Sequence, residues 1–289
     1  MEIRCNAKLN LSFDIVGVRA DGYHLVDTVM QSVDLCDFMT ITPTDGSEIE
    51  IRSDNTSLPV GEGNLVYRAA KLLSDIYKVK NSGVSVYIKK RIPLRAGLGG
   101  GSANAAGALL ALNKLWNLDI GDDELACLGL ELGADVPFCL RGGTFRAKGI
   151  GEELISLPPF PECFFVIAMP GAGVSTECAY RQIDEKRDYA RPDTERLISA
   201  ICEGNTVAAA VRFCNVFETS GTNAASSEII EKMRLLGAAG ASMTGSGAAV
   251  FGLFMNEDDA ANCCEKLKSD SLAYTAKPSM SGIITDSCQ

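Results

Sequence analysis

The sequence predicts a globular protein of mixed strands and helices, divided into two domains at residues 1–157 and 158–289. A long apolar alternation near the N-terminus indicates a strand. A glycine-rich run followed by an alanine-rich stretch indicates a loop that opens into a helix. The division rests on Leu157-Pro158-Pro159-Phe160-Pro161, a stiff proline-rich crossover at which the texture of the sequence changes.

The composition argues against several classes of function. The formal net charge is −10 and no block of Lys or Arg occurs, so a nucleic-acid partner is not expected. No apolar run approaches the ~20 residues of a membrane span, and the N-terminus has no apolar signal segment; we therefore expect no membrane partner and a cytoplasmic location. The eleven cysteines are scattered and only one histidine is present, so reduced thiols are expected and a structural zinc site is not.

The first expected element is a strand from Ile3 to Ile15, in which apolar residues occupy every second position. This pattern is typical of a strand with one buried face. Lys8 and Asn10 share the other face. Because a lysine on the polar face of a strand is usually solvated, spacing alone does not assign Lys8 a function.

A tight turn follows at Asp21-Gly22, which is a favourable hairpin sequence. Beyond it, Tyr23 and His24 are typical of ordinary exposed residues. Asn64 is a suitable N-cap for an amphipathic helix. The elements expected in this part of the chain are strands at 30–35, 38–42 and 49–51 and a helix that begins after residue 64.

The glycine-rich run lies between a strand-like alternation at 84–88 and a helix with an alanine-rich start. Glycines allow a ligand to approach the backbone N–H groups, and a helix N-terminus adds unpaired donors and partial positive charge. The run is denser than a turn requires, so a nucleotide phosphate site is favoured over a structural turn. A Walker A loop would need a lysine before Ser102, and a dinucleotide fingerprint would need a glycine at Ser102.

A second helix is expected at 123–132, ending at Gly133. Pro137 cannot continue that helix, so Asp135 is expected on an irregular connection. From spacing alone, Asp135 is a loop aspartate that caps a neighbouring element.

In the second half, a buried strand is expected at 164–169, and a helix is expected to follow with Ser175 or Thr176 as its cap. Tyr180 in this helix is either a core residue or an aromatic contact for a ligand. Helices are expected within 193–237 and at 258–267, and a glycine turn between two strands is expected at 240–251.

Three of these stretches resemble the motifs of the GHMP kinases, the family of galactose, homoserine, mevalonate and phosphomevalonate kinases. The central motif is matched by Pro-x-x-x-Gly-Leu-Gly-Gly-Gly-Ser from Pro93 to Ser102, and the third motif by residues 240–251. Gly133-Ala134-Asp135-Val136-Pro137 resembles the family's catalytic-aspartate motif. Ala7-Lys8-Leu9-Asn10-Leu11 and Arg19–His24 resemble signatures of one branch, whose substrate carries a cytidine diphosphate.

The resemblance implies an α+β fold with two halves. The N-terminal half would be the ATP-binding domain, similar to ribosomal protein S5 domain 2, and the C-terminal half would be ferredoxin-like. The active site would lie in the cleft between them.

The resemblance also implies roles for individual residues. Lys8 and Asp135 would be catalytic, and Ser102 is a candidate ligand of Mg²⁺. The cytidine substrate would meet Asn10, Tyr23, His24 and Tyr180. The residues implied for ATP are Asn64, which is equally explained as an N-cap, and Pro93, Leu94, Arg95, Ala96, Gly97, Leu98, Gly99, Gly100, Gly101, Ser102 and Ala103.

The implied activity is phosphorylation by ATP, with Mg²⁺, of the 2-hydroxyl of 4-diphosphocytidyl-2-C-methyl-D-erythritol, on the non-mevalonate route to isoprenoids. Two alternatives remain open: a homoserine or mevalonate type of GHMP kinase, and a nucleotide-binding sensor without catalysis. The Tyr23-His24 signature argues against the first, and the presence of both Lys8 and Asp135 argues against the second. Val216 departs from the family, in which an aspartate is expected at that position.

Overall fold

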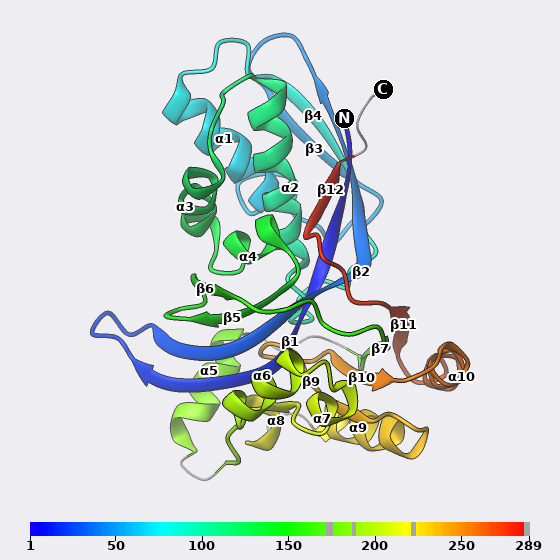
Figure 1. The fold of residues 1–289 in the computed structure, drawn as a ribbon. Coiled ribbons are helices and arrows are strands. Elements are labelled where there is room, and N and C mark those ends of the chain that lie inside the picture. The colour runs from blue at the N-terminus through cyan, green and yellow to red at the C-terminus, as the bar shows by residue number, and fades with distance from the viewer. Residues whose placement is uncertain (172–175, 187–188, 221–223, 286–289) are drawn as a thin grey trace.

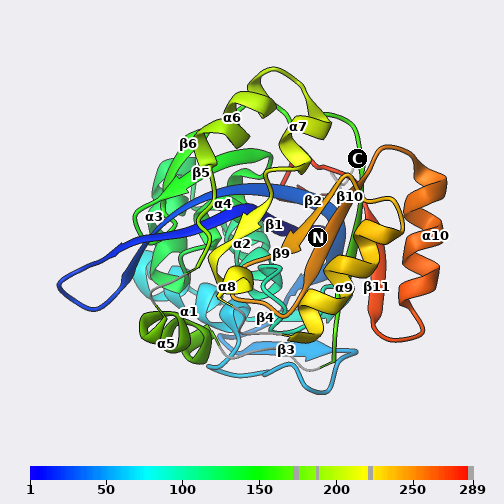
Figure 2. The same ribbon diagram turned by 90° about the horizontal axis from the view of Figure 1, so that it is seen from below.

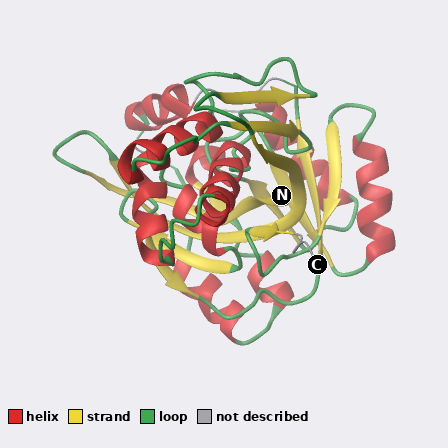
Figure 3. Ribbon diagram, turned by 90° about the horizontal axis from the view of Figure 1, so that it is seen from above, coloured by secondary structure: helices red, strands yellow, loops and turns green. Residues whose placement is uncertain are grey.

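The computed structural model describes residues 1–171, 176–186, 189–220 and 224–285. It contains two separate sheets with helices packed against them, which confirms the expected α+β class. Seen from above, strands run between a group of helices on the left and a helix on the right (Figure 3). Ser175, one of the two expected caps, lies outside the described residues.

The larger sheet has the strand order β12-β1-β2-β4-β3. Three further strands extend it, because β5 pairs with β2, β6 pairs with β5, and β8 pairs with β1. Its strands are β1 (Glu2–Val18), β2 (His24–Pro43), β3 (Ile49–Ser53), β4 (Val84–Lys89), β5 (Thr144–Lys148), β6 (Glu153–Ser156), β8 (Cys214–Asn215) and β12 (Ile283–Thr285).

Four helices lie together beside this sheet (Figure 1). Their apolar residues form one buried cluster with the strands, including Leu73, Leu109, Leu112 and Val86. The expected helix ends are largely confirmed, and the side chain of Asn64 caps the first helix by accepting a hydrogen bond from the backbone N–H of Val66. These helices are α1 (Leu65–Tyr77), α2 (Gly100–Leu115), α3 (Asp122–Leu132) and α4 (Val136–Arg141).

The smaller sheet has the order β11-β7-β10-β9. On one face, Val166 and Val250 pack against α9 and α10. On the other face, Phe165 and Phe251 pack against residues of the larger sheet such as Leu9. The elements are β7 (Phe164–Met169), β9 (Gly240–Met243), β10 (Val250–Phe254), β11 (Leu272–Ala276), α9 (Ala224–Leu235) and α10 (Glu257–Leu267).

Four more helices belong to the second half: α5 (Thr176–Glu185), α6 (Thr194–Cys202), α7 (Thr206–Ala210) and α8 (Val216–Thr219). Seen from below, α5 and α6 lie on opposite sides of the β1–β2 hairpin, which projects from the body of the protein (Figure 2). The turn of this hairpin contains Gly22 with φ of +88°, as expected for Asp21-Gly22.

Strand β1 differs from the expected half-buried strand, because both of its faces are covered from Cys5 to Asp14. The helices of the larger sheet cover one face, and the smaller sheet together with α6 covers the other. Lys8 and Asn10 are therefore not solvated, and only 4% and 2% of their surfaces are exposed. Both side chains are held inside the protein.

One further expectation is corrected by the structure and one is confirmed. The segments 30–35 and 38–42 belong to one continuous strand, β2, whose pairing with β1 shifts register between Asn6 and Ala7. Asp135 lies, as expected, on a turn between two helices, because α3 ends at Leu132 and α4 begins at Val136, with Pro137 in its first turn. Proline is tolerated there, since the first N–H groups of a helix have no partner within the helix.

The division at residue 157 remains a prediction. Strands β8 and β12 come from beyond this residue and join the larger sheet beside β1. The larger sheet is thus built from both halves of the sequence.

Candidate active site

The glycine-rich run forms the loop between β4 and α2 that the sequence predicts. Gly99 occupies the N-cap position of α2 with φ of +69°, and no side chain caps this helix. The first bond of the helix runs from the backbone N–H of Ala103 to the carbonyl of Gly99. In the described part of the chain, the N–H groups of Gly100, Gly101 and Ser102 have no partner. They form an anion site at the positive end of the helix.

Packing explains most of the glycines in this loop. A Cβ on Gly97 would lie 2.3 Å from the carbonyl oxygen of Thr244, and one on Gly99 would lie 2.9 Å from Cγ of Lys8. At Gly100 the obstacle is Ile92, at 2.9 Å, whereas at Gly101 the nearest atom is 3.6 Å away. The turn after β9 therefore backs the loop, as the sequence predicts for the third motif.

A buried ionic cluster lies behind the loop and was not predicted. Asp37 is completely buried and pairs with the ammonium group of Lys90. Its carboxylate also accepts hydrogen bonds from the backbone of Arg91 (2.7 Å) and Ile92 (2.9 Å) and from the side chain of Asn104 (3.0 Å). The cluster joins the end of β4 and the first turns of α2 to strand β2, and so fixes both ends of the loop.

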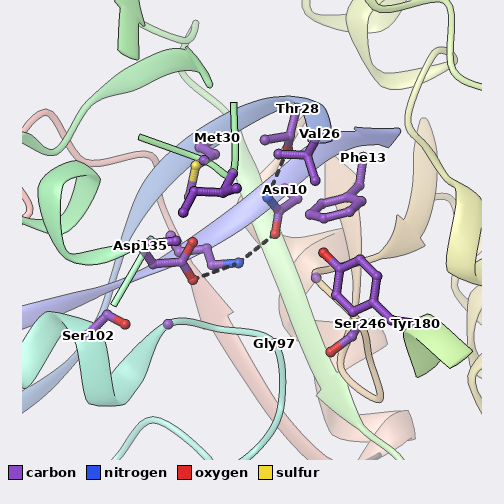
Figure 4. Close-up of a pocket in the computed structure, with 16 residues that line it drawn as sticks. Asn10, Phe13, Val26, Thr28, Met30, Gly97, Ser102, Asp135, Tyr180 and Ser246 are labelled. Carbon is purple, nitrogen blue, oxygen red and sulfur yellow. Dashed lines mark hydrogen bonds and ion pairs between the residues drawn. The ribbon is translucent and has the colours of Figure 1, made fainter. Parts of the chain in front are cut away.

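Lys8 lies at the centre of the site, between Asn10 and Asp135 (Figure 4). Its Nζ donates a hydrogen bond of 2.6 Å to Oδ1 of Asn10 and lies 3.6 Å from Oδ2 of Asp135. The amide of Asn10 is fixed in turn, because it donates to Oγ1 of Thr28 at 2.9 Å. The backbone N–H of Lys8 donates to the carbonyl of Leu98, so β1 is bonded directly to the loop.

Asp135 occupies the N-cap position of α4, but its carboxylate makes no capping bond. The expected capping role is therefore wrong, and the carboxylate faces Lys8 instead. The side chain of Asp135 is 36% exposed, whereas that of Lys8 is 5% exposed. The pair thus presents an accessible acceptor backed by a desolvated positive charge.

These residues line a cavity of about 280 Å³. Ser102 and Asp135 lie on one side of it, and Phe13, Tyr180 and Ser246 lie on the other (Figure 4). Of the residues implied for ATP, Gly97, Gly99 and Ser102 line this cavity. The side chains of Ala96, Leu98 and Ala103 are buried in the core. The other residues implied for ATP line neither this cavity nor the one that Tyr23 and His24 line. They are Asn64, Pro93, Leu94, Arg95, Gly100 and Gly101.

A second cavity of about 780 Å³ adjoins the first and shares Ala134, Ile150 and Tyr180 with it. Tyr23 and His24 line this second cavity. Nε2 of His24 lies 2.8 Å from Oδ1 of Asp184, a residue that the sequence analysis did not single out. Burial raises the pKa of the Tyr180 hydroxyl, with a further contribution from the negative charge of Asp135, so Tyr180 stays neutral.

The structure thus gathers the predicted catalytic and substrate-binding residues, with three of the residues predicted for ATP, around two adjoining cavities. Asn64 is not among them: its side chain caps α1 and donates to the carbonyl of Pro59 at 2.6 Å, which favours the capping role. Among the described residues, no group of three or more His, Cys, Asp or Glu side chains could hold a metal by itself. In the same part of the chain, none of the helices combines the length and apolarity needed to cross a bilayer.

Comparisons with known proteins agree with this geometry. Residues 64–143 match the model of the GHMP kinases N terminal domain, and residues 197–271 match that of the GHMP kinases C terminal domain. The chain is 42% identical over 271 residues to 4-diphosphocytidyl-2-C-methyl-D-erythritol kinase of Clostridium tetani, covering 93% of this chain and 96% of that protein. The chain belongs to the GHMP kinase family.

Other relatives support the same assignment. The kinase of the same name from Clostridioides difficile is 39% identical over 287 residues, covering 98% of this chain and 97% of that protein. A crystal structure of 4-(cytidine 5'-diphospho)-2C-methyl-D-erythritol kinase matches with a TM-score of 0.82 and 33% identity, over 96% of this chain and 99% of that one. The homoserine kinase of Cytophaga hutchinsonii shares the fold, with a TM-score of 0.77 at 19% identity over 98% of this chain and 96% of that one.

As a member of this family, the protein is a phosphotransferase that uses ATP as donor and an alcohol group as acceptor. The comparisons also confirm the two-domain GHMP kinase fold that the sequence predicts.

Proposed function

We propose that this kinase phosphorylates the 2-hydroxyl of 4-diphosphocytidyl-2-C-methyl-D-erythritol, on the non-mevalonate route to isopentenyl diphosphate. The observation that carries the proposal is the Lys8–Asp135 pair beside the glycine loop, in a cavity that adjoins a second one lined by Tyr23 and His24. Relatives of that name at 39% to 42% identity support the choice of substrate.

Asp135 acts in this proposal as the proton acceptor. An alcohol holds its proton far more tightly than a carboxylic acid does, so Asp135 does not deprotonate the substrate in advance. It orients the hydroxyl and accepts its proton late, once the phosphoryl group has begun to transfer. Its partly exposed carboxylate is within reach of a bound substrate.

Lys8 acts as the charge stabiliser. Its ammonium group has three N–H donors, of which one is taken by Asn10 and a second points to Asp135. The third is available for an oxygen of the transferring phosphoryl group. Because only 5% of this side chain is exposed, water screens its charge little.

The residues present fit ATP and Mg²⁺. The unpaired N–H groups at the start of α2 suit phosphate oxygens. In such sites Mg²⁺ is held largely by phosphate oxygens and water, and the Ser102 hydroxyl, which lines the cavity, is the group of this chain that would hold it. When bound, Mg²⁺ neutralises charge on the phosphates.

The second cavity is proposed to hold the cytidine end of the substrate. The ring of Tyr180 is already packed between His24, at a centroid distance of 4.6 Å, and Phe217, at 5.0 Å. Tyr23 is 62% exposed, so its ring is the better candidate to stack on the base.

The protein's scattered cysteines, free throughout the described residues, support a location in the reducing cytoplasm.

A coupled assay of ADP release, with a panel of acceptors, tests the proposal. We expect turnover with the cytidine compound and little with homoserine or mevalonate. Preference for either of the latter would establish the alternative type of GHMP kinase. ATP binding without turnover of any acceptor would establish the sensor.

A further inference from the structure

His24 makes two contacts, one through a nitrogen in the plane of its ring and one through the face of the ring. Nε2 lies 2.8 Å from Oδ1 of Asp184, and the ring centroid lies 4.6 Å from that of Tyr180. The imidazole is 15% exposed and the carboxylate 54% exposed. His24 opens β2 and Asp184 lies on α5, so the pair joins the hairpin to α5 beside the cavity that both residues line.

The contact with Asp184 determines where the imidazole carries its proton. An ionised carboxylate can only accept hydrogen bonds, so Nε2 of His24 must be the protonated nitrogen. In the neutral imidazole, Nδ1 then carries a lone pair and can only accept. Without Asp184 the proton could occupy either nitrogen.

This assignment bears on which base the second cavity prefers. Cytosine carries an amino group at its 4-position, which donates hydrogen bonds, whereas uracil carries a carbonyl, which accepts them. An acceptor on the protein binds the first and repels the second. A neutral imidazole free to shift its proton would adapt to both.

We propose that Asp184 is a positioning residue that fixes His24 in the Nε2–H tautomer, so that Nδ1 accepts a hydrogen bond from the amino group of cytosine. Asp184 thereby determines the preference for cytosine over uracil. The part that concerns the base rests on the proposed function, whereas the part that concerns the tautomer does not.

The first experiment needs no substrate. His24 is the only histidine of the chain, so an untagged protein labelled with ¹⁵N-histidine shows one imidazole by NMR. Spectra are recorded at increasing pH, and the tautomer is read where the imidazole signals no longer change with pH. The nitrogen coupled to both carbon-bound ring protons is Nε2, and we expect it to be the protonated one.

Variants then test whether Asp184 is responsible. Asp184→Asn can donate as well as accept, so we expect a mixture of both tautomers, and Asp184→Glu should restore the single one. Glu185→Gln removes the same charge from the neighbouring exposed position of α5 and should leave the spectrum unchanged. An Nδ1–H tautomer in the unaltered protein, or an unchanged spectrum in Asp184→Asn, would overturn the assignment.

The second experiment measures base preference with the cytidine substrate and its uridine analogue. In Asp184→Asn the ratio of the two kcat/KM values should fall about tenfold, which corresponds to ~1.4 kcal/mol. The change should appear in KM for the cytidine compound, with kcat and the KM for ATP retained, and Asp184→Glu should recover part of it. An unchanged ratio refutes the specificity role. If the unaltered protein uses neither compound, the proposed function fails instead, and the NMR result still decides the tautomer.

Discussion

Removing the charge of Asp37 should destabilise the protein strongly, although this residue lies outside the cavity. In Asp37→Asn the buried ammonium group of Lys90 loses its counterion and keeps only the side-chain oxygen of Asn104, at 3.3 Å. The new amide would also direct N–H donors at groups that are themselves donors. Breaking a buried ion pair in this way costs about 3–5 kcal/mol.

The loss of stability in Asp37→Asn can be measured as a fall in the melting temperature, Tm. For a chain of this size each kcal/mol corresponds to roughly 2–4 °C, so Tm should fall by on the order of 10 °C. Differential scanning calorimetry measures this directly. Asp34→Asn is the matched control on the same strand, because Asp34 is exposed and accepts one bond, from the backbone of Lys277. We expect its Tm to change little.

A double-mutant cycle identifies the cause. Lys90→Met alone leaves Asp37 as an unpaired buried charge, whereas Asp37→Asn with Lys90→Met leaves neither charge. If the pair is coupled, the double variant is less destabilised than the sum of the single ones. Strict additivity, or a Tm for Asp37→Asn equal to that of Asp34→Asn, would refute the argument that Asp37 holds the base of the loop through Lys90.

Three further predictions concern the site. Asp135→Asn should reduce kcat by several orders of magnitude and leave ATP binding intact, and Lys8→Ala should have a comparable effect on kcat through lost charge neutralisation; near-normal turnover in Asp135→Asn would contradict the proposed roles. Gly97→Ala should lower Tm by several degrees, because the new Cβ would meet the backbone of the third motif. Gly101→Ala has room for its Cβ, so it should retain Tm and raise the KM for ATP. Calorimetry measures the first effect and kinetics the second. His24→Ala should raise the KM for the cytidine substrate and leave that for ATP unchanged, and the reverse pattern would place the base at the other end of the site.

Most strands and helices followed from local patterns in the sequence. The alternation at 84–88 and the apolar run at 164–169 each formed a strand with nearly those limits, because every second residue of the first and all but the first residue of the second are buried. The loop and the helix behind it also followed, since few other structures accommodate so many glycines before an alanine-rich stretch.

The environment of Lys8 could not be predicted from its own strand. Alternation reports one buried face, and that face packs against residues such as Phe165 and Phe251. The face that carries Lys8 is covered instead by the glycine loop and by Asp135, which lie far along the chain from β1. The role of Asp135 could not be predicted from its neighbours in sequence either. Its neighbours in sequence indicate a cap, and only the position of β1 shows that its carboxylate faces Lys8 instead.

The sequence did contain a pattern that indicates the Asp37–Lys90 pair. Asp37 shares the inward face of β2 with Met39 and Ile41, and Lys90 continues the inward face of β4 after Ile88. Opposite charges on the inward faces of two neighbouring strands indicate a buried pair, provided that the pairing of the strands is known. That pairing, Phe38 with Lys89, is a property of the fold.

The position of the last strand has a consequence for synthesis of the chain. Strand β12 pairs with Ile3–Cys5 of β1, so residues 283–285 lie beside the start of the chain. A ribosome synthesises these residues long after it has made β1, and until then this edge of β1 exposes unpaired backbone groups. Such an edge can pair with another nascent chain and aggregate. The N-terminal half therefore depends on residues 283–285 to complete its sheet, and truncation before Ile283 leaves that edge open.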